Sequence, residues 1–246
     1  MYGPGNHNNA MSMTSPKPKK VTSKVKKWIV ESPLRYSHKI AMVNHLALLD
    51  KWRSQYDGMP YFEERFQLYD YLSSEVIGPS PITYLEFGVY QGNAIRYWSE
   101  LNAHSDSSFV GFDTFEGLPE NWQIYTGELK QGHFDTGGKF PDINDKRVRF
   151  VKGLFQDTLP GFLETFKPVN QLVINNDSDL YPSTLYTLCK LDPLMRPGTI
   201  IIFDEFSQVL DEFRALEDYS KSFRRKYEVL GASGQYYDRV AIRWIS

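Results

Sequence analysis

The sequence of 246 residues has little cysteine, no long apolar run and little net charge. Its single cysteine, Cys189, excludes an internal disulfide framework and is typical of a reducing compartment. No segment approaches the roughly 20 apolar residues that a membrane-spanning helix needs, and the N-terminal stretch lacks an apolar signal core. The formal net charge of -2 gives no general reason to expect nucleic acid or a membrane as partner. We therefore expect a cytoplasmic protein.

The composition is that of a globular protein, with 41% apolar and 24% charged residues. This length can bury a substantial core in one large domain. Residues 1–21 are rich in Gly, Asn, Ser, Pro and Lys, which predicts a disordered tail. Apolar residues recur at helical spacing in Tyr36–Trp52 and Phe62–Val76. We therefore expect an N-terminal helical cap over residues 22–80 and a single α/β domain over residues 81–246.

Short apolar runs alternate with helical segments throughout the predicted α/β domain. The alternation indicates right-handed β-α-β crossovers and a mostly parallel sheet covered on both faces. The predicted strands are Ile82–Phe87, Ser108–Phe112, Val148–Val151, Gln171–Asn175 and Thr199–Phe203. The predicted helices are Ala94–Leu101, Leu159–Phe166, Ser183–Leu191 and Phe206–Lys221.

The end of the chain predicts an antiparallel hairpin. A strand at Tyr227–Leu230 is followed by turn residues at 231–234 and a strand at Tyr237–Ile245. In the last strand Val240, Ile242 and Trp244 alternate with arginines, as expected of a strand with two different faces. The hairpin completes a seven-stranded sheet of the Rossmann-like class.

One long segment, Glu120–Lys146, does not fit the alternation. It contains four glycines together with Trp122 and Tyr125. Structureless loops of this length are usually functional or disordered. Because the segment leaves from the carboxyl edge of the sheet, a lid over the site and plain disorder both remain open.

The segment Tyr84–Ala94 is the most informative part of the chain. An apolar strand leads to Glu86, then to Gly88 and Gly92, and then to a helix that opens at Asn93. Glycine allows a sharp turn and a close approach to a ligand, and the helix start offers free N–H groups. This pattern indicates a nucleotide-type cofactor at the carboxyl end of the first strand, although the spacing differs from the dinucleotide fingerprint.

Acidic residues follow the first two strands. Glu86 would shape the cofactor loop, or it is a buried carboxylate that accepts hydrogen bonds from the glycine turn. Asp113 could accept hydrogen bonds from both ribose hydroxyls of a nucleotide, or it is an ordinary surface residue. The polar turn after the third strand, which includes Asp157, would lie beside an adenine ring.

Four carboxylates follow two later strands: Asp177 and Asp179 after one, Asp204 and Glu205 after the next. Crowded carboxylates repel one another, and a divalent cation such as Mg²⁺ would remove that repulsion. The alternative is helix N-capping by Asp179 and Asp204, which accounts for two of the four. We favour a metal site.

These motifs resemble the macrocin O-methyltransferase family of class I S-adenosylmethionine-dependent methyltransferases. The resemblance covers roughly Ile82 to Phe206, and its most specific block is Asp-Thr-Phe-Glu-Gly-Leu-Pro at residues 113–119. It implies S-adenosylmethionine and Mg²⁺ as cofactors and methyl transfer to a hydroxyl of a sugar-like molecule. By position, it implies a metal site at Asp177, Asp204 and Glu205. The implied cofactor site comprises Glu86, Gly88, Val89, Gly92, Asp113, Thr114 and Asp157.

The chain also departs from the family pattern. Glu205 stands where a second Asp is common, and Asn175-Asn176 replaces a His-apolar pair. No histidine follows His133, so the C-terminal histidine base expected of the antibiotic enzymes is absent. We therefore expect Asp177 to act in catalysis and His133 to serve as general base, although a solvated loop histidine is the simpler interpretation.

The sequence leaves three functional classes open. The favoured one is an O-methyltransferase with a small polyhydroxylated acceptor. Methyl transfer to nitrogen would not need the carboxylate cluster, and a non-catalytic binding protein would not need Glu86, Gly88, Gly92 and Asp113. The acceptor stays unidentified, and a homo-oligomer stays open.

Overall fold

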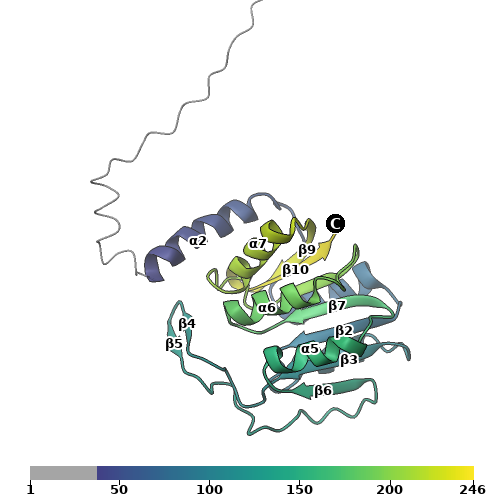
Figure 1. Cartoon of the computed structure of the whole chain (residues 1–246). Helices are drawn as coiled ribbons and strands as arrows, with labels where there is room; N and C mark the ends of the chain where they lie inside the picture. The colour runs from purple at the N-terminus through teal and green to yellow at the C-terminus, as the bar shows by residue number, and fades with distance from the viewer. Residues whose placement is uncertain (1–37) are drawn as a thin grey trace, which may run out of the picture. The chain divides into compact units, whose positions relative to one another are not determined.

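The predicted sheet is present with its seven strands and one short addition (Figure 1). The structure is a computed structural model that describes residues 38–246, so the predicted tail at 1–21 lies outside the described residues. The strands of the main sheet are β1 (Tyr61–Phe62), β2 (Ile82–Phe87), β3 (Ser108–Asp113), β6 (Val148–Lys152), β7 (Gln171–Asn176), β8 (Ile200–Phe203), β9 (Tyr227–Ser233) and β10 (Arg239–Trp244). They lie in the order β1-β9-β10-β8-β7-β2-β3-β6.

The pairing of the strands confirms a mostly parallel sheet with an antiparallel C-terminal hairpin. The pairs β2–β3, β2–β7, β3–β6 and β7–β8 are parallel, whereas β10 is antiparallel to both β8 and β9. The predicted turn at 231–234 was wrong, because β9 continues to Ser233. Ala232 and Ser233 pair with β1 on one side and with β10 on the other, so the chain turns only from Gly234 onward.

Helices cover both faces of the sheet. They are α2 (His38–Arg53), α3 (Arg65–Tyr71), the π-helix η2 (Leu72–Ile77), α4 (Asn93–Leu101), α5 (Phe155–Thr165), α6 (Tyr181–Leu191), α7 (Glu212–Phe223) and the 3₁₀ turn η3 (Gln235–Tyr237). Helices α5, α6 and α7 lie on one face (Figure 1), where Leu188 and Phe213 pack against Phe87 and Phe112. On the other face, Leu68 of α3 and Trp98 of α4 pack against Tyr84 and its neighbours.

Three predicted helices were shifted. The helix predicted at Leu159–Phe166 begins at Phe155, so Asp157 lies in the first turn of α5 and not in a turn before the helix. The segment Phe62–Val76 instead contains β1, then α3 from Arg65, then η2. Pairing with β9 keeps Phe62 extended, and a capping box between Glu64 and Gln67 starts the helix. The helix predicted from Phe206 begins only at Glu212, after a stretch of bends and turns at the carboxyl edge of the sheet.

The long segment Glu120–Lys146 is not structureless. It contains a two-stranded hairpin, β4 (Trp122–Ile124) and β5 (Gly127–Leu129). The buried Trp122 donates from its indole N–H to Asp211 (3.0 Å), and the hydroxyl of Tyr125 donates to the carbonyl of Ser207. The hairpin is thus attached to the turn that precedes α7, and its function as a lid stays a prediction.

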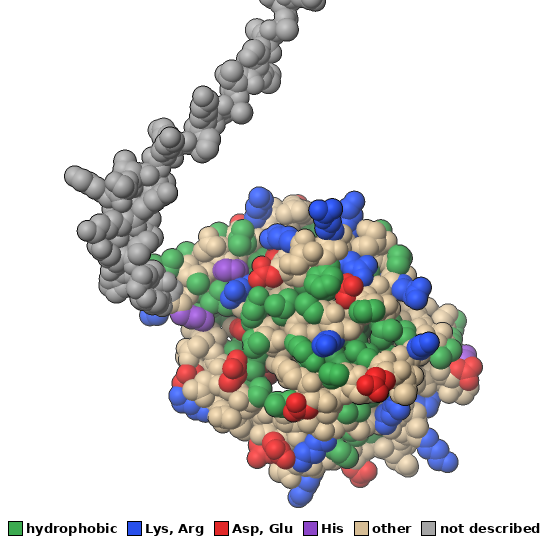
Figure 2. Space-filling model, viewed as in Figure 1, with side chains coloured by type: hydrophobic (Ala, Val, Ile, Leu, Met, Phe, Trp, Pro, Cys, Tyr) green, Lys and Arg blue, Asp and Glu red, His purple; other side chains and the backbone are tan. Residues whose placement is uncertain are grey.

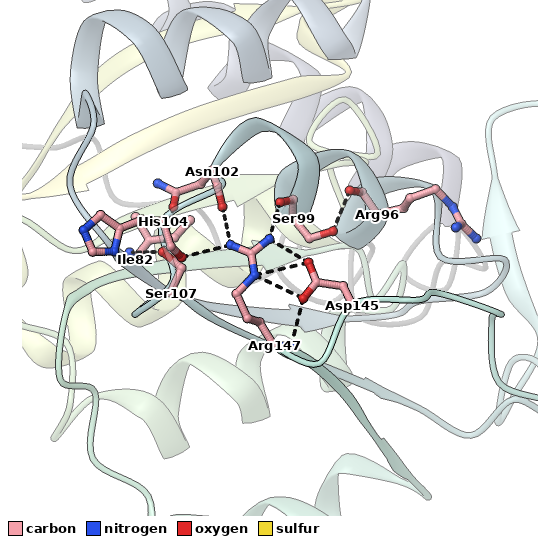
Figure 3. Close-up of polar contacts among 8 residues, drawn as sticks. All are labelled: Ile82, Arg96, Ser99, Asn102, His104, Ser107, Asp145 and Arg147. Atoms are coloured by element: carbon pink, nitrogen blue, oxygen red, sulfur yellow. Dashed lines mark hydrogen bonds and ion pairs between the residues drawn. The ribbon is translucent and has the colours of Figure 1, made fainter.

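The chain leaves this long segment at a polar cluster around Arg147 (Figure 3). The Arg147 guanidinium holds Asp145, with Nη2 2.6 Å from Oδ2 and Nε 3.1 Å from Oδ1. It also donates to three carbonyls at the end of α4, those of Ser99, Asn102 and His104, at 2.6–3.0 Å. The carbonyls of Ser99 and Asn102 lie at the C-terminus of α4, where carbonyls have no partner within the helix, so Arg147 caps α4 and holds it to the start of β6.

Among residues 38–246 no helix combines the length and the apolar content needed to cross a membrane. On the face shown in Figure 2, basic and acidic side chains are interspersed with hydrophobic ones.

Candidate active site

The predicted carboxylates meet at the carboxyl edge of the sheet. The hydrogen-bond ladder continues one residue beyond the strands, because the N–H of Gly88 donates to Phe112 (2.9 Å) and that of Asp177 to Phe87 (2.9 Å). The N–H of Asp204 donates likewise to Asn176 (3.1 Å). Gly88, Asp177 and Asp204 therefore lie side by side across β2, β7 and β8, with Asp113 at the end of β3 beside them.

A cavity of about 450 Å³ opens above this edge. Of the residues singled out from the sequence, nine line it: Glu86, Gly88, Val89, Asp113, Thr114, Asp177, Asp179, Asp204 and Glu205. Three others are not among its lining residues: Gly92 is the N-cap residue of α4, Asp157 is exposed on α5, and His133 is exposed with its ring against that of Phe134. The structure thus gathers the acidic residues but leaves His133 outside the cavity wall.

Asp113 holds the glycine turn together. Its Oδ2 accepts the N–H groups of Val89 (2.7 Å) and Tyr90 (2.8 Å), and its Oδ1 accepts that of Phe115 (2.7 Å). These two N–H groups of the turn are therefore occupied by the Asp113 carboxylate and do not point toward a ligand. The space beside Gly88 is also filled by the protein, since a Cβ there would lie 1.7 Å from the carbonyl oxygen of Asp177. Together with a φ of +90°, this contact requires glycine.

Glu86 is a buried carboxylate with 1% exposure. Burial raises its pKa to about 8, although the hydroxyl of Tyr84 donates to it over 2.5 Å. Asp204 adds to the upward shift of the pKa. Among the described residues no Lys or Arg forms an ion pair with Glu86. A negative charge on Glu86 is therefore costly until a positively charged group enters the cavity.

The acidic residues after β7 and β8 disfavour one another's charges. Burial, and then the proximity of Asp204, raise the pKa of Asp177 well above its ordinary value. Burial and Glu205 do the same for Asp179, and burial with Asp204 raises the pKa of Glu205 to about 7. The edge thus has an excess of acidic groups.

Asp204 differs from these neighbours because arginines bind it. Arg239 of β10 donates from Nε to Oδ1 (2.8 Å) and from Nη2 to Oδ2 (3.4 Å). Nη1 of Arg65, at the start of α3, lies 3.6 Å from Oδ2. Both arginines line the cavity, and neither was predicted as a site residue. The alternation in the last strand, once paired with β8, could have placed Arg239 beside Asp204.

The carboxylate cluster, as placed, fits neither helix N-capping by Asp179 and Asp204 nor the predicted metal site. Neither Asp179 nor Asp204 caps a helix, since the N-cap residues of α6 and α7 are Leu180 and Asp211. For the metal site, the part of the chain that the structure describes has no group of three His, Cys, Asp or Glu side chains arranged to hold an ion. With Arg239 on Asp204, the three predicted ligands as placed do not fit a magnesium ion.

A further acidic residue supports the edge from behind. Glu212, in the first turn of α7, is fully buried and accepts the backbone N–H of Glu205 (2.9 Å). It also accepts from the side chain of Asn176 (3.0 Å), which approaches Ser178 and Thr184 as well. Burial raises the pKa of Glu212 well above its ordinary value. The sequence placed it inside a helix and assigned it no function.

Comparison with known proteins agrees with this fold. The family described as "Macrocin-O-methyltransferase (TylF)" matches residues 67–237, more than half of the chain. The chain belongs to the macrocin O-methyltransferase family. The resemblance noted in the motifs is thereby confirmed.

Two curated relatives come from Streptomyces. A tetracenomycin-C rhamnosyl 4'-O-methyltransferase from Streptomyces olivaceus is 33% identical over 159 residues, 55% of this chain and 56% of the relative. Demethyldecarbamoylnovobiocin O-methyltransferase from Streptomyces niveus is 31% identical over 169 residues, 58% of this chain and 63% of the relative. The matches thus span less than two thirds of either relative.

Solved structures show the same fold. The O-methyltransferase NovP has a TM-score of 0.57 at 24% identity, over 74% of this chain and 80% of its own. The calicheamicin methyltransferase CalS11 has a TM-score of 0.52 at 18% identity, over 99% of both chains. This chain therefore has the fold of the class I methyltransferases.

Proposed function

We propose that this protein transfers a methyl group from S-adenosylmethionine to a hydroxyl oxygen of a sugar-bearing small molecule. One observation carries the proposal: the cavity of this methyltransferase fold is lined by carboxylates, of which Glu86 and Asp177 form no ion pair among the described residues. Such a lining favours a ligand of net positive charge. S-adenosylmethionine, with its sulfonium and amino groups, fits that requirement.

The cofactor, when bound, supplies an activated methyl group. The residues of this chain would bind and orient it: Asp113 fixes the turn that forms one wall, and Glu86 places a carboxylate at the cavity. Asp177 lines the cavity and would accept the proton of the acceptor hydroxyl at its carboxylate once the positive charge of the bound cofactor favours its charged form. His133 as general base stays a prediction, because its exposed ring would have to move to reach the cavity.

A sugar hydroxyl as the acceptor rests on three supports. The name of the Streptomyces olivaceus relative specifies a rhamnosyl compound. The aromatic rings of Tyr90 and Phe134 lie 5.3 Å apart at the cavity, and aromatic faces suit the apolar side of a sugar. Oxygen also requires a base to remove its proton, which the acidic edge offers.

Magnesium assistance and a cytoplasmic location stay predictions. The crowding of carboxylates at Asp177, Asp179 and Glu205 supports a cation at the site. The pairing of Asp204 with Arg239 opposes one at the predicted position. The location rests on the single cysteine, Cys189.

The test is a methyl-transfer assay with the full chain, S-adenosylmethionine and a panel of glycosylated small molecules and free sugars. We expect a mass gain of one methylene on an acceptor hydroxyl, and S-adenosylhomocysteine as the second product. Binding of S-adenosylhomocysteine by calorimetry provides a separate readout. If the protein binds neither form of the cofactor, the proposal fails whatever the acceptor is.

A further inference from the structure

The cavity contains two positive side chains, Arg65 and Arg239, among its lining residues. Seven carboxylates line the same cavity, so the positions of the two guanidiniums decide which acidic groups remain uncompensated: Glu64, Glu86, Asp113, Asp177, Asp179, Asp204 and Glu205. Both arginines are directed to a single one of these, Asp204.

The fold holds Arg239 against Asp204. Strand β10 runs antiparallel to β8, and Val240 pairs with Phe203. Arg239, which precedes Val240, therefore lies opposite Asp204, which follows Phe203. The guanidinium takes both carboxylate oxygens, at 2.8 Å and 3.4 Å, in the side-on arrangement that suits this pair of groups. The side chain of Asp204 is only 5% exposed and that of Arg239 only 21%, so water screens the pair weakly.

Arg65 adds a second positive charge beside Asp204, from a helix. It begins α3, and its Nη1 lies 3.6 Å from Oδ2 of Asp204 while its guanidinium lies over the ring of Phe66. Its side chain is 26% exposed. Asp204 is therefore bound between a strand arginine and a helix arginine.

A divalent ion at this position would compete with both arginines. Mg²⁺ requires oxygen ligands at roughly 2.0–2.1 Å in an octahedral arrangement. Arg239 contacts both oxygens of Asp204 and Arg65 lies near one of them, so an ion on either oxygen would lie close to two positive charges and be repelled by them.

We propose that Arg239, assisted by Arg65, is the built-in counter-ion of Asp204, and that it excludes divalent cations from the position where the family resemblance implies magnesium. The negative charge of Asp204 is then neutralised by arginines of the same chain. Removing the positive charge at residue 239 should allow a divalent cation to bind at Asp204.

The test is a titration of the full-length protein with Mn²⁺ alone, followed by calorimetry and by the electron paramagnetic resonance signal of free Mn²⁺. Removing one positive charge in contact with Asp204 should tighten Mn²⁺ binding more than about tenfold in Arg239→Gln. Arg65→Gln should tighten it less, because its nitrogen is farther from the carboxylate. Arg239→Lys, which keeps the charge, should resemble the wild type.

Arg243→Gln is the matched control, because Arg243 lies on the same strand and pairs with Glu228 outside the cavity. A double variant, Arg239→Gln with Asp204→Asn, should lose the gained affinity. The proposal is overturned if the wild type binds Mn²⁺ with micromolar affinity, or if Arg239→Gln binds it no more tightly than Arg243→Gln does. If Arg239→Gln fails to fold, the wild-type titration and Arg65→Gln decide alone. The outcome is independent of the acceptor, so its failure leaves the methyl-transfer proposal intact.

Discussion

Two clusters of charged residues in this molecule are built in opposite ways. Around Arg147, one guanidinium faces one carboxylate, and its other donors reach backbone carbonyls of α4 (Figure 3). The guanidinium lowers the pKa of Asp145, so the charged form is favoured in the folded protein. At the carboxyl edge, carboxylates outnumber arginines, and burial raises the pKa of Glu86, Asp177 and Asp179.

The difference separates a structural cluster from a binding site. In the Arg147 cluster every charge is compensated within the chain, and the result is attachment of α4 to the start of β6. At the carboxyl edge the compensation is incomplete, and a positively charged ligand can complete it. We therefore expect mutations in the first cluster to affect mainly stability, and mutations in the second to affect mainly ligand binding and pH dependence.

The largest expected effect comes from breaking the balanced cluster. In Arg147→Ala, Asp145 loses its counter-ion, and the carbonyls of Ser99 in α4 and of its C-cap residue Asn102 lose the Arg147 donor. Loss of one partner from this partly buried pair, together with the lost capping bonds, should lower the free energy of unfolding by about 3 kcal/mol. The measurement is urea unfolding. Arg149→Ala is the control, because Arg149 is exposed and only lies over the ring of Phe162. Equal stability of the two variants would refute the role of Arg147 as a cap.

The second prediction concerns Glu86 and the pH. Its pKa is about 8 in the folded protein against 4.5 ordinarily, so between these values the folded state binds more protons than the unfolded state. The stability of the ligand-free protein should therefore fall as the pH rises from about 5 to 8 and then level off. Glu86→Gln has no carboxylate to ionise at this position. Its free energy of unfolding should therefore rise relative to that of the wild type by about 2 kcal/mol as the pH goes from 6 to 8.

Denaturant unfolding at several pH values measures this gain. Glu100→Gln is the control, since Glu100 is an exposed carboxylate on α4. Parallel stability curves for the wild type and Glu86→Gln would show that Glu86 is not a strained carboxylate. Because a cationic ligand favours the charged form of Glu86, bound S-adenosylmethionine should lower the pKa of Glu86 in the folded state. The loss of stability with rising pH should then be smaller and should end at a lower pH than in the ligand-free protein.

The sequence was sufficient for the sheet and for the position of its acidic edge. A short run of apolar residues indicates a strand that is buried on both faces of the sheet. Ile82–Phe87 is such a run, and it was predicted with its observed bounds. The two strands that precede Asp177 and Asp204 were expected to be neighbours, and β7 does pair with β8.

What escaped prediction depends on contacts between distant residues. Arg65 begins α3 more than 130 residues before Asp204 and carries no motif, so its contact is visible only in the fold. Phe62 looks helical in period, but pairing with Ser233 makes it a strand residue. The sequence offered Glu86 as an acceptor for the glycine turn and Asp113 as an acceptor of ribose hydroxyls, but the N–H groups of Val89 and Tyr90 bind Asp113.

The smallest expected effect tests that last point. Asp113→Ala leaves three backbone N–H groups without their acceptor, so the turn between β2 and α4 loses its fixed shape. We expect the affinity for S-adenosylhomocysteine to fall about tenfold, which corresponds to about 1.4 kcal/mol. Asp113→Asn keeps one acceptor oxygen and should lose less. Asp157→Ala is the control within the predicted cofactor set, because Asp157 is exposed on α5 and is not among the lining residues of the cavity. Calorimetry decides: if Asp157→Ala weakens binding as much as Asp113→Ala, the cofactor lies farther along α5 than the cavity indicates. If neither variant changes the affinity, the glycine turn does not form the cofactor wall.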